Sequence, residues 1–123
     1  MEVRLAHVWY VTVDCRDPDA LAGFWSRVLG LPVKGRFGDN FVMLARPSED
    51  AVAMAFQRVP EAKVVKNRTH VDLRIDDIGA VTELVESLGG SRVEDHDEEG
   101  FRWRVMRDPE GNEFCLMPSG QDG

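Results

Sequence analysis

The sequence predicts an α+β fold built from two βαβββ modules, with helices on the outer side of mixed sheets. Strand-type and helix-type patterns follow one another in the same order in both halves of the chain. The end of the first predicted helix, Leu29-Gly30, is repeated 59 residues later as Leu88-Gly89. The end of the first half, Val59-Pro60, returns 58 residues later as Met117-Pro118. Two similar modules therefore account for the whole pattern.

The first module should begin with a strand over residues 6–14, where AHVWYVTVD is rich in β-branched and aromatic residues. A helix is expected from Asp17-Pro18-Asp19, because carboxylates favour the N-terminus of a helix. Apolar residues then recur at three- and four-residue spacing until Gly30, which ends the helix. The other expected elements of this module are strands over 32–37, 41–45 and 52–59, a turn at 38–40 and a charged connector over 60–67.

The second module repeats this order. A strand with alternating polar and apolar residues is expected over 69–75, and Asp76-Asp77 should open a helix that Gly89-Gly90 closes. A short strand at 91–94 should lead into an acidic, solvated loop over 94–100. The last two expected strands, over 101–106 and 112–117, are joined by Asp108-Pro109-Glu110-Gly111, which is a strong tight-turn sequence.

Length and composition narrow the classes of partner. The chain has 123 residues, with 15 Lys and Arg against 22 Asp and Glu and a net charge of −7. This length favours one domain over residues 1–123, with modules at about 5–60 and 66–118. Nucleic acid and anionic membranes are not expected partners, because phosphate binding needs a surplus of Lys and Arg. Two cysteines are too few for a disulfide framework, so we expect a cytoplasmic protein with free thiols.

The alternation of strand side chains assigns residues to sheet faces, and a shift of one residue would invert them. In the strand over 69–75 we expect the apolar row to face the helix, which leaves His70 on the other face. The same parity turns Tyr10 away from the first helix, and an offset of 58 residues pairs Gln57 with Cys115. If the two helix-free faces curl toward each other, they form a cup suited to a small molecule. The candidate residues on these faces are Tyr10, Gln57, His70, Glu113 and Cys115.

The strand over 101–106 leaves one choice open. Trp103 belongs to an aromatic and apolar row, whereas Arg104 belongs to the row on the opposite face. If the row of Trp103 lines the cup, flat apolar ligands are favoured. If the row of Arg104 lines it, an anionic ligand is favoured.

Three segments carry a family resemblance: DCRDPDALAGFWSRVLGLPV, KNRTHVDLRIDDIGAVTELVESLGG and MRDPEGNEFCLMP. Together they resemble the glyoxalase-like branch of the vicinal oxygen chelate superfamily, which is also known as the glyoxalase/bleomycin resistance/dioxygenase superfamily. The resemblance covers nearly the whole chain. It implies paired βαβββ modules that form a curved, cup-shaped mixed sheet, commonly in homodimers. The superfamily includes metal-dependent glyoxalases, extradiol dioxygenases, epimerases and metal-free antibiotic-binding proteins.

The resemblance also implies where metal ligands would stand. In metal-dependent members, His or Glu residues on the first and last strands of each module bind a divalent ion. The corresponding positions here are Tyr10, Gln57, His70 and Cys115, and only His70 is a usual ligand of that family. Hard ions such as Mg²⁺ and Mn²⁺ prefer carboxylate and water oxygens. We therefore expect a degenerate metal site, with His70 and Glu113 as the candidate ligands of any divalent metal.

Each chemical candidate also has a plainer interpretation. His70 could act as a general base, a ligand contact or a hydrogen-bond donor, or it could be a structural histidine bonded to Asp72 or Tyr10. Glu113 is the first candidate for proton chemistry, and otherwise a solvated strand residue. For Cys115 we expect an inert buried thiol, because no neighbour in the sequence lowers its pKa.

The leading hypothesis is a glyoxalase-like protein that binds a small organic molecule through Tyr10, Gln57, His70, Trp103 and Cys115. Its catalytic candidates are His70 and Glu113. The first alternative is a divalent-metal-dependent lyase, isomerase or dioxygenase that acts on a small oxygenated metabolite. The second alternative is a dimeric interaction domain without catalysis.

Overall fold

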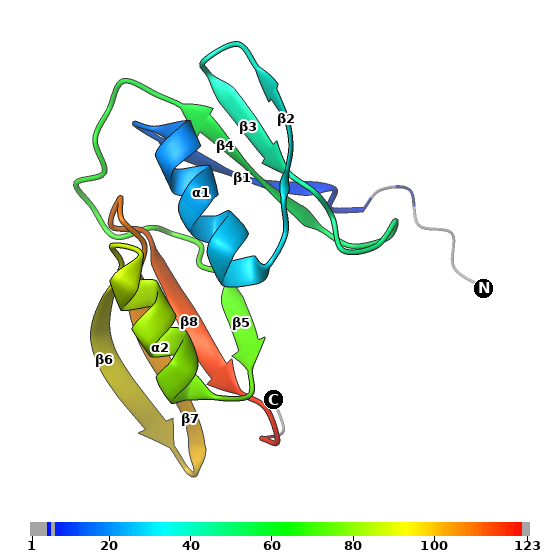
Figure 1. Cartoon of the computed structure of the whole chain (residues 1–123). Coiled ribbons are helices and arrows are strands. Elements are labelled where there is room, and N and C mark those ends of the chain that lie inside the picture. Colours follow the sequence, from blue (N-terminus) through cyan, green and yellow to red (C-terminus); the bar gives the residue numbers. More distant parts are fainter. Residues whose placement is uncertain (1–4, 6, 122–123) are drawn as a thin grey trace. The chain divides into compact units, whose positions relative to one another are not determined.

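A computed structural model describes residue 5 and residues 7–121. The chain divides into two compact units, Met1–Ala62 and Lys63–Gly123, which are described separately here. Each unit has the order strand, helix, strand, strand, strand, so the α+β class and the two βαβββ modules are confirmed (Figure 1). Within the described residues, no helix is both long and apolar enough to cross a membrane.

The first unit is an open four-stranded mixed sheet with one helix. Its elements are β1 (Tyr10–Cys15), α1 (Pro18–Leu29), β2 (Val33–Phe37), β3 (Phe41–Leu44) and β4 (Ala53–Arg58). The strand order is β1-β4-β3-β2, in which β1 runs parallel to β4 and the other pairs are antiparallel. The Asp17 carboxylate caps α1 by accepting the Ala20 backbone N–H at 3.1 Å. Gly30 closes the helix at a φ of 68°, a conformation that glycine adopts without steric cost.

The core of this unit lies between α1 and the sheet, because α1 contacts β3 and β4. Leu21 and Trp25 of α1 are 1% and 2% exposed, and Leu44 and Phe56 of the sheet are completely buried. Burial of each such side chain contributes about 1.5–3 kcal/mol. The apolar spacing that predicts the helix is therefore also what holds it on the sheet.

The second unit repeats the architecture, with one helix on one face of a four-stranded sheet (Figure 1). Its elements are β5 (Asp72–Ile75), α2 (Ile78–Ser87), β6 (Ser91–Glu98), β7 (Phe101–Arg107) and β8 (Glu113–Pro118). The strand order is β5-β8-β7-β6, with β5 parallel to β8. The Asp77 carboxylate caps α2 by accepting the Ala80 N–H at 3.0 Å, which mirrors the cap of α1.

The predicted acidic loop over 94–100 is wrong. Strand β6 continues to Glu98 and pairs antiparallel with β7, and only Glu99 and Gly100 form the turn. Their φ values of 53° and 87° are both positive, as in the hairpin turns whose twist matches that of the strands. Asp95 accepts hydrogen bonds from Arg104 on the neighbouring strand, so cross-strand pairing stabilises a segment whose composition suggests a loop.

The strand expected over 69–75 begins only at Asp72, and the reason lies in one side chain. The Asn67 amide donates to the Glu113 carbonyl at 3.2 Å and accepts the Glu113 N–H at 2.9 Å. A side chain thus takes the place of backbone pairing at the start of β8. The Val71 carbonyl still accepts the Cys115 N–H at 3.0 Å, but the segment before Val71 is irregular, and His70 lies in it. The strand expected over 6–14 likewise begins later, at Tyr10, and residue 6 lies outside the described residues.

The turn predicted at 108–111 is confirmed. Asp108 is 3% exposed, and its Oδ1 accepts the N–H groups of Glu110 at 2.9 Å and Asn112 at 3.0 Å. The Gly111 N–H donates to the Asp108 carbonyl at 2.9 Å. This turn fixes the point at which β8 begins.

Gly90 is required by close packing after α2. A Cβ atom added there would lie 2.6 Å from Cγ1 of Val85 and 2.7 Å from the Arg107 carbonyl oxygen. We expect Gly90→Ala to lower the free energy of unfolding by about 1–3 kcal/mol through overpacking. In Gly23→Ala, the matched control within α1, the new Cβ meets nothing within 4 Å. This control should raise stability by about 0.5–1 kcal/mol, because glycine is unfavourable inside helices. Urea denaturation measures both, and equal stability of Gly90→Ala and the native chain would contradict the assignment.

Candidate functional site

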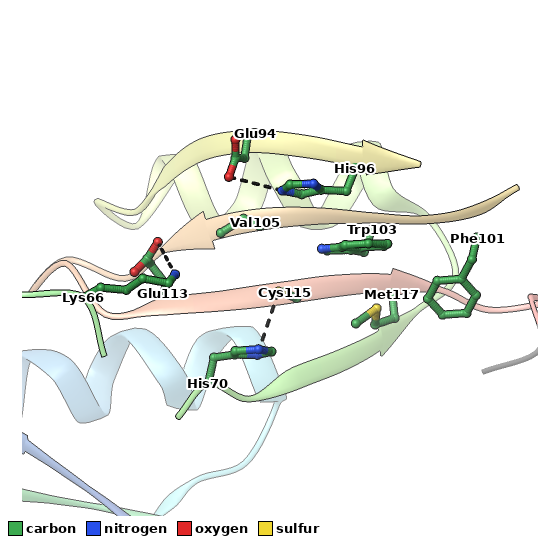
Figure 2. A pocket seen from close by; sticks show the side chains of 10 residues that line it. All are labelled: Lys66, His70, Glu94, His96, Phe101, Trp103, Val105, Glu113, Cys115 and Met117. Carbon is green, nitrogen blue, oxygen red and sulfur yellow. Dashed lines mark hydrogen bonds and ion pairs between the residues drawn. The ribbon is translucent and has the colours of Figure 1, made fainter. Parts of the chain in front are cut away.

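The second unit contains a pocket of about 410 Å³ on the face of its sheet that α2 does not cover. Figure 2 shows side chains from β6, β7 and β8 and from the segment before β5 turned toward it. The lining residues are Lys66, His70, Glu94, His96, Phe101, Trp103, Val105, Glu113, Cys115 and Met117. All of them belong to the second module.

Strand register decides which row of β7 lines the pocket. Val105 pairs with Cys115 of β8, and Trp103 pairs with His96 of β6, so these residues share one face. Arg104 belongs to the other face, where it donates to the Thr82 hydroxyl of α2 at 2.9 Å and to Asp95 at 2.7 Å. The hydrogen bond from Arg104 lowers the pKa of Asp95. Of the two alternatives that the sequence leaves open, the structure selects the row of Trp103.

One wall of the pocket is aromatic. The rings of His96 and Trp103 stack with centroids 4.9 Å apart and planes 12° from parallel. Phe101 lies beside Trp103, with centroids 6.1 Å apart and a tilt of 50°. The imidazole of His96 is held from its other side by Glu94, because Nε2 lies 3.2 Å from Oε1. This wall offers a flat surface against which another ring can stack.

The opposite wall carries an ion pair. The Lys66 ammonium lies 3.1 Å from Oε2 of Glu113, whose side chain is only 11% exposed. Because Glu113 is largely enclosed and its Oε2 is paired with a cation, the carboxylate is held in one place beside the pocket. The geometry therefore favours a positioning role for this carboxylate.

His70, Asp72 and Cys115 form a compact group beside this pair. Nδ1 of His70 lies 3.0 Å from Oδ1 of Asp72 and 4.0 Å from the Cys115 sulfur. One ring nitrogen cannot both donate to the carboxylate and accept the thiol proton, so the three residues do not form a nucleophile–base–orienter relay. Burial, together with the negative charge of Asp72, raises the pKa of Cys115 to about 11. The expected unreactive thiol agrees with these surroundings.

The remaining predicted residues, Tyr10 and Gln57, belong to the first unit. The Tyr10 ring meets Trp9 edge to face at 4.6 Å, and the Arg46 guanidinium lies 4.9 Å from its centroid. Gln57 is exposed on β4, opposite Asp14 of β1. The structure therefore gathers His70, Trp103, Glu113 and Cys115 into one pocket, and the contribution of Tyr10 and Gln57 stays a prediction.

Lys66, Glu94, His96 and Met117 are lining residues that the sequence reasoning missed. A weak signal for two of them was present, because Gly100 can supply the positive φ of a hairpin turn between two segments of similar length. With 94–98 assigned to a strand, alternation places Glu94 and His96 on one face. Lys66 lies in an irregular connector, and no local sequence pattern predicts its ion pair with Glu113.

Comparison with known protein families assigns the chain to a family. A family described as "Glyoxalase-like domain" matches residues 10–117. The chain belongs to this glyoxalase-like family. The superfamily expected from the three sequence segments is therefore confirmed. No curated protein matches the chain in sequence.

Solved structures share the fold of this glyoxalase-like chain. A glyoxalase/bleomycin resistance protein/dioxygenase family enzyme from Burkholderia phytofirmans PsJN has a TM-score of 0.74 at 18% identity, covering 90% of this chain and 97% of that one. A mutant of the fosfomycin resistance protein FosX from Listeria monocytogenes has a TM-score of 0.76 at 12% identity, covering 94% and 90%. FosX from Mesorhizobium loti has a TM-score of 0.70 at 16% identity, covering 95% and 94%. At these identities the likeness concerns the fold alone.

The FosX mutant is complexed with Mn(II) and 1S,2S-dihydroxypropylphosphonic acid, so its fold can hold a hard divalent ion. The donors of this chain do not fit such an ion. Beside His70 stands a thiol, Cys115, and the Glu113 carboxylate is engaged by Lys66. Only Asp72 adds an oxygen ligand to the group. A hard ion prefers a set composed mainly of oxygens.

The raised pKa of Cys115 leads to a reactivity prediction. A thiol with a pKa of about 11 carries roughly 100-fold less thiolate at pH 8 than an ordinary cysteine, whose pKa is 9.0. We expect iodoacetamide to label Cys115 at least that much more slowly in the folded chain than in the urea-unfolded chain. The labelling rate should rise with pH as long as the fold persists. Peptide mass mapping separates Cys115 from Cys15.

Asp72→Asn tests whether the Asp72 carboxylate contributes to the raised pKa of Cys115. Removal of the carboxylate should lower the pKa of Cys115 and speed its labelling at a fixed pH, although burial still slows it. Rapid labelling of Cys115 at pH 8 in the native chain would show that the thiol is not held in its neutral form.

Proposed function

We propose that this glyoxalase-like chain binds a small organic molecule with a flat aromatic part, which stacks on Trp103 in the pocket of the second module. The parallel stack of His96 and Trp103 carries this proposal, because it builds a rigid aromatic wall inside a cavity. A volume of about 410 Å³ falls in the range of sites for drug-sized ligands. The polar groups opposite the wall, His70 and Glu113, would orient the ligand by hydrogen bonds.

The charges of the site favour a neutral or cationic ligand. Each basic side chain among the described lining residues has a carboxylate partner: Lys66 with Glu113, His70 with Asp72, and His96 with Glu94. An anion would have to compete with these carboxylates for the cations. The proposed ligand therefore differs in charge from the phosphonate that is bound in the FosX complex.

Metal-assisted catalysis is a second candidate function, in the form of a lyase, isomerase or dioxygenase reaction. It is supported by the group of His70, Asp72 and Cys115, whose ligand atoms all lie within 4.8 Å of one another. Glu113 is not part of that group, so its predicted role as a metal ligand finds less support than that of His70. A cytoplasmic homodimer remains our expectation for the state of the protein.

The stacking proposal predicts a graded loss of binding. A thermal-shift screen with planar probes of similar size, namely indole, N-methylquinolinium and indole-3-carboxylate, should show stabilisation by the first two and little by the third. A bound ligand stabilises the fold by RT ln(1 + [L]/Kd). Trp103→Ala should weaken the affinity about tenfold, which corresponds to about 1.4 kcal/mol of stacking. Trp103→Phe should retain most of it.

Trp9→Ala provides the matched control, because Trp9 is 66% exposed and lies in the other unit, outside this pocket. We expect it to leave probe binding unchanged. Isothermal titration of each variant measures the affinities. Equal losses in Trp9→Ala and Trp103→Ala would place the ligand elsewhere, and preference for indole-3-carboxylate would contradict the charge argument.

A further inference from the structure

We propose that the pocket of the second module binds aromatic amines, in which a ring stacks on Trp103 and an ammonium group replaces Lys66 beside the Glu113 carboxylate. This inference rests on the proposed stacking function and deepens it, because it names the chemical class of the ligand. Lys66 is then an internal competitor of the ligand and not one of its binding groups.

Glu113 is the enclosed carboxylate of the pocket. Its side chain is 11% exposed, and its backbone N–H donates to the Asn67 side chain at 2.9 Å, which holds the start of β8. A carboxylate that is largely removed from water needs a cationic or hydrogen-bonding partner. Glu94, the second carboxylate among the described lining residues, has a side chain that is 59% exposed and lies beside His96. Water therefore screens Glu94 more than Glu113, so Glu113 is the stronger site for a cation.

Lys66 is a partner that a ligand can replace. Its side chain is 72% exposed and belongs to an irregular connector, and its ammonium lies 3.1 Å from Oε2 of Glu113. Such a lysine contributes little to an ion pair, because holding a long, mobile side chain in one position costs entropy. When Lys66 leaves, water hydrates its ammonium and the side chain regains rotational freedom. The ammonium of the ligand takes its place, so the exchange leaves Glu113 paired.

The layout of the pocket face sets the shape of the ligand. Glu113 pairs with Arg107 in the antiparallel ladder, and Trp103 stands four residues before Arg107 on β7, which corresponds to about 13 Å along the strand. Val105 and Cys115, which are 9% and 5% exposed, lie between the ring and the carboxylate (Figure 2). An apolar floor thus separates the two binding groups. An aliphatic arm that joins the aromatic ring to the ammonium fits this floor.

Charge selects amines over acids and alcohols. The described lining residues include two carboxylates and one ammonium, which leaves one excess negative charge when the histidines are neutral. An ammonium that replaces Lys66 forms charge-assisted hydrogen bonds with Glu113, and these are stronger than the bond that an alcohol of the same length forms. A carboxylate on the ligand would be repelled by Glu113 once Lys66 has left. The alcohol is therefore the neutral reference for each amine.

The test titrates the whole chain with indol-3-yl-alkylamines that have arms of two, four and six carbons, and with the alcohols of equal length. Isothermal titration with a chelator present gives the affinities. We expect the amine of best-fitting length to bind about 10-fold or more tightly than its alcohol, as a charge-assisted hydrogen bond implies. Glu113→Gln should remove this preference and leave the affinity for the alcohol nearly unchanged.

Lys66→Met should have the opposite effect. The substitution keeps most of the aliphatic stem and removes the competing ammonium. The amine should then bind about threefold or more tightly than it binds to the native chain, because Glu113 has lost its other cation. The affinity for the alcohol should not change. A lysine that contacted the ligand directly would give a loss of binding instead.

Two surface variants are the matched controls. Lys63→Met removes a lysine of the same connector, and Glu98→Gln removes an exposed carboxylate of β6. Neither residue is among the described residues that line the pocket, so both variants should keep the native preference for amines. The proposal is overturned if no amine binds more tightly than its alcohol, or if Lys66→Met weakens amine binding. It is also overturned if Glu94→Gln removes the preference while Glu113→Gln keeps it.

These outcomes differ from a failure of the proposed function. Binding of indole and the alcohols through Trp103, with no preference for amines, would leave the stacking proposal intact and overturn this one. A preference for amines that needs Glu113 but survives Trp103→Ala would contradict the stacking, while the exchange at Glu113 stands. If Glu113→Gln does not fold, the sign of the effect of Lys66→Met still decides between a competing and a binding lysine.

Discussion

Strand β8 is hydrogen-bonded to β5 on one side and to β7 on the other, and the rest of the site depends on this double pairing. Cys115 stands opposite Asp72 in one ladder and opposite Val105 in the other. A slip of one residue in either ladder would turn the pocket face into the helix face. The turn around Asp108 and the amide of Asn67 hold the beginning of β8 at Glu113, so they also set this register.

The same register places structural polar contacts on the helix side of the sheet and the charged residues of the pocket on the other side. On the helix side, Arg104 is enclosed and satisfied by Asp95 and Thr82, which stabilises the contact between sheet and helix. On the pocket side, charged groups are paired around an aromatic wall, and burial together with the nearby Asp72 carboxylate raises the pKa of the Cys115 thiol. A ligand or ion that enters the pocket meets groups that are already arranged, so little reorganisation is required for binding.

Much of the fold is contained in local sequence signals. The repeated spacing, the Asp caps and the apolar helix faces predict both modules, and the alternation of residues in the last strand places Glu113 and Cys115 on one face. His70 also lines the pocket, although the strand expected to carry it begins only at Asp72. The row of Trp103 could not be chosen in advance, because its alternation is symmetric until the pairing of β7 with β8 is known. The start of strand β6 was predicted, but its continuation to Glu98 was not, because the acidic composition of that part suggests a loop and pairing with β7 stabilises it. The contacts of Lys66 and Asn67 with Glu113 join residues far apart in the sequence, so no local pattern predicts them.

The acidity of β6 limits how copies of this chain can associate. β6 forms an edge of its sheet and carries Glu94, Asp95, Asp97 and Glu98 within eight residues. If the β6 strands of two copies added to each other, carboxylates would lie opposite carboxylates, which disfavours extension of the sheet at that edge. The negative charge thereby keeps this edge solvated, and a homodimer would have to assemble through another surface.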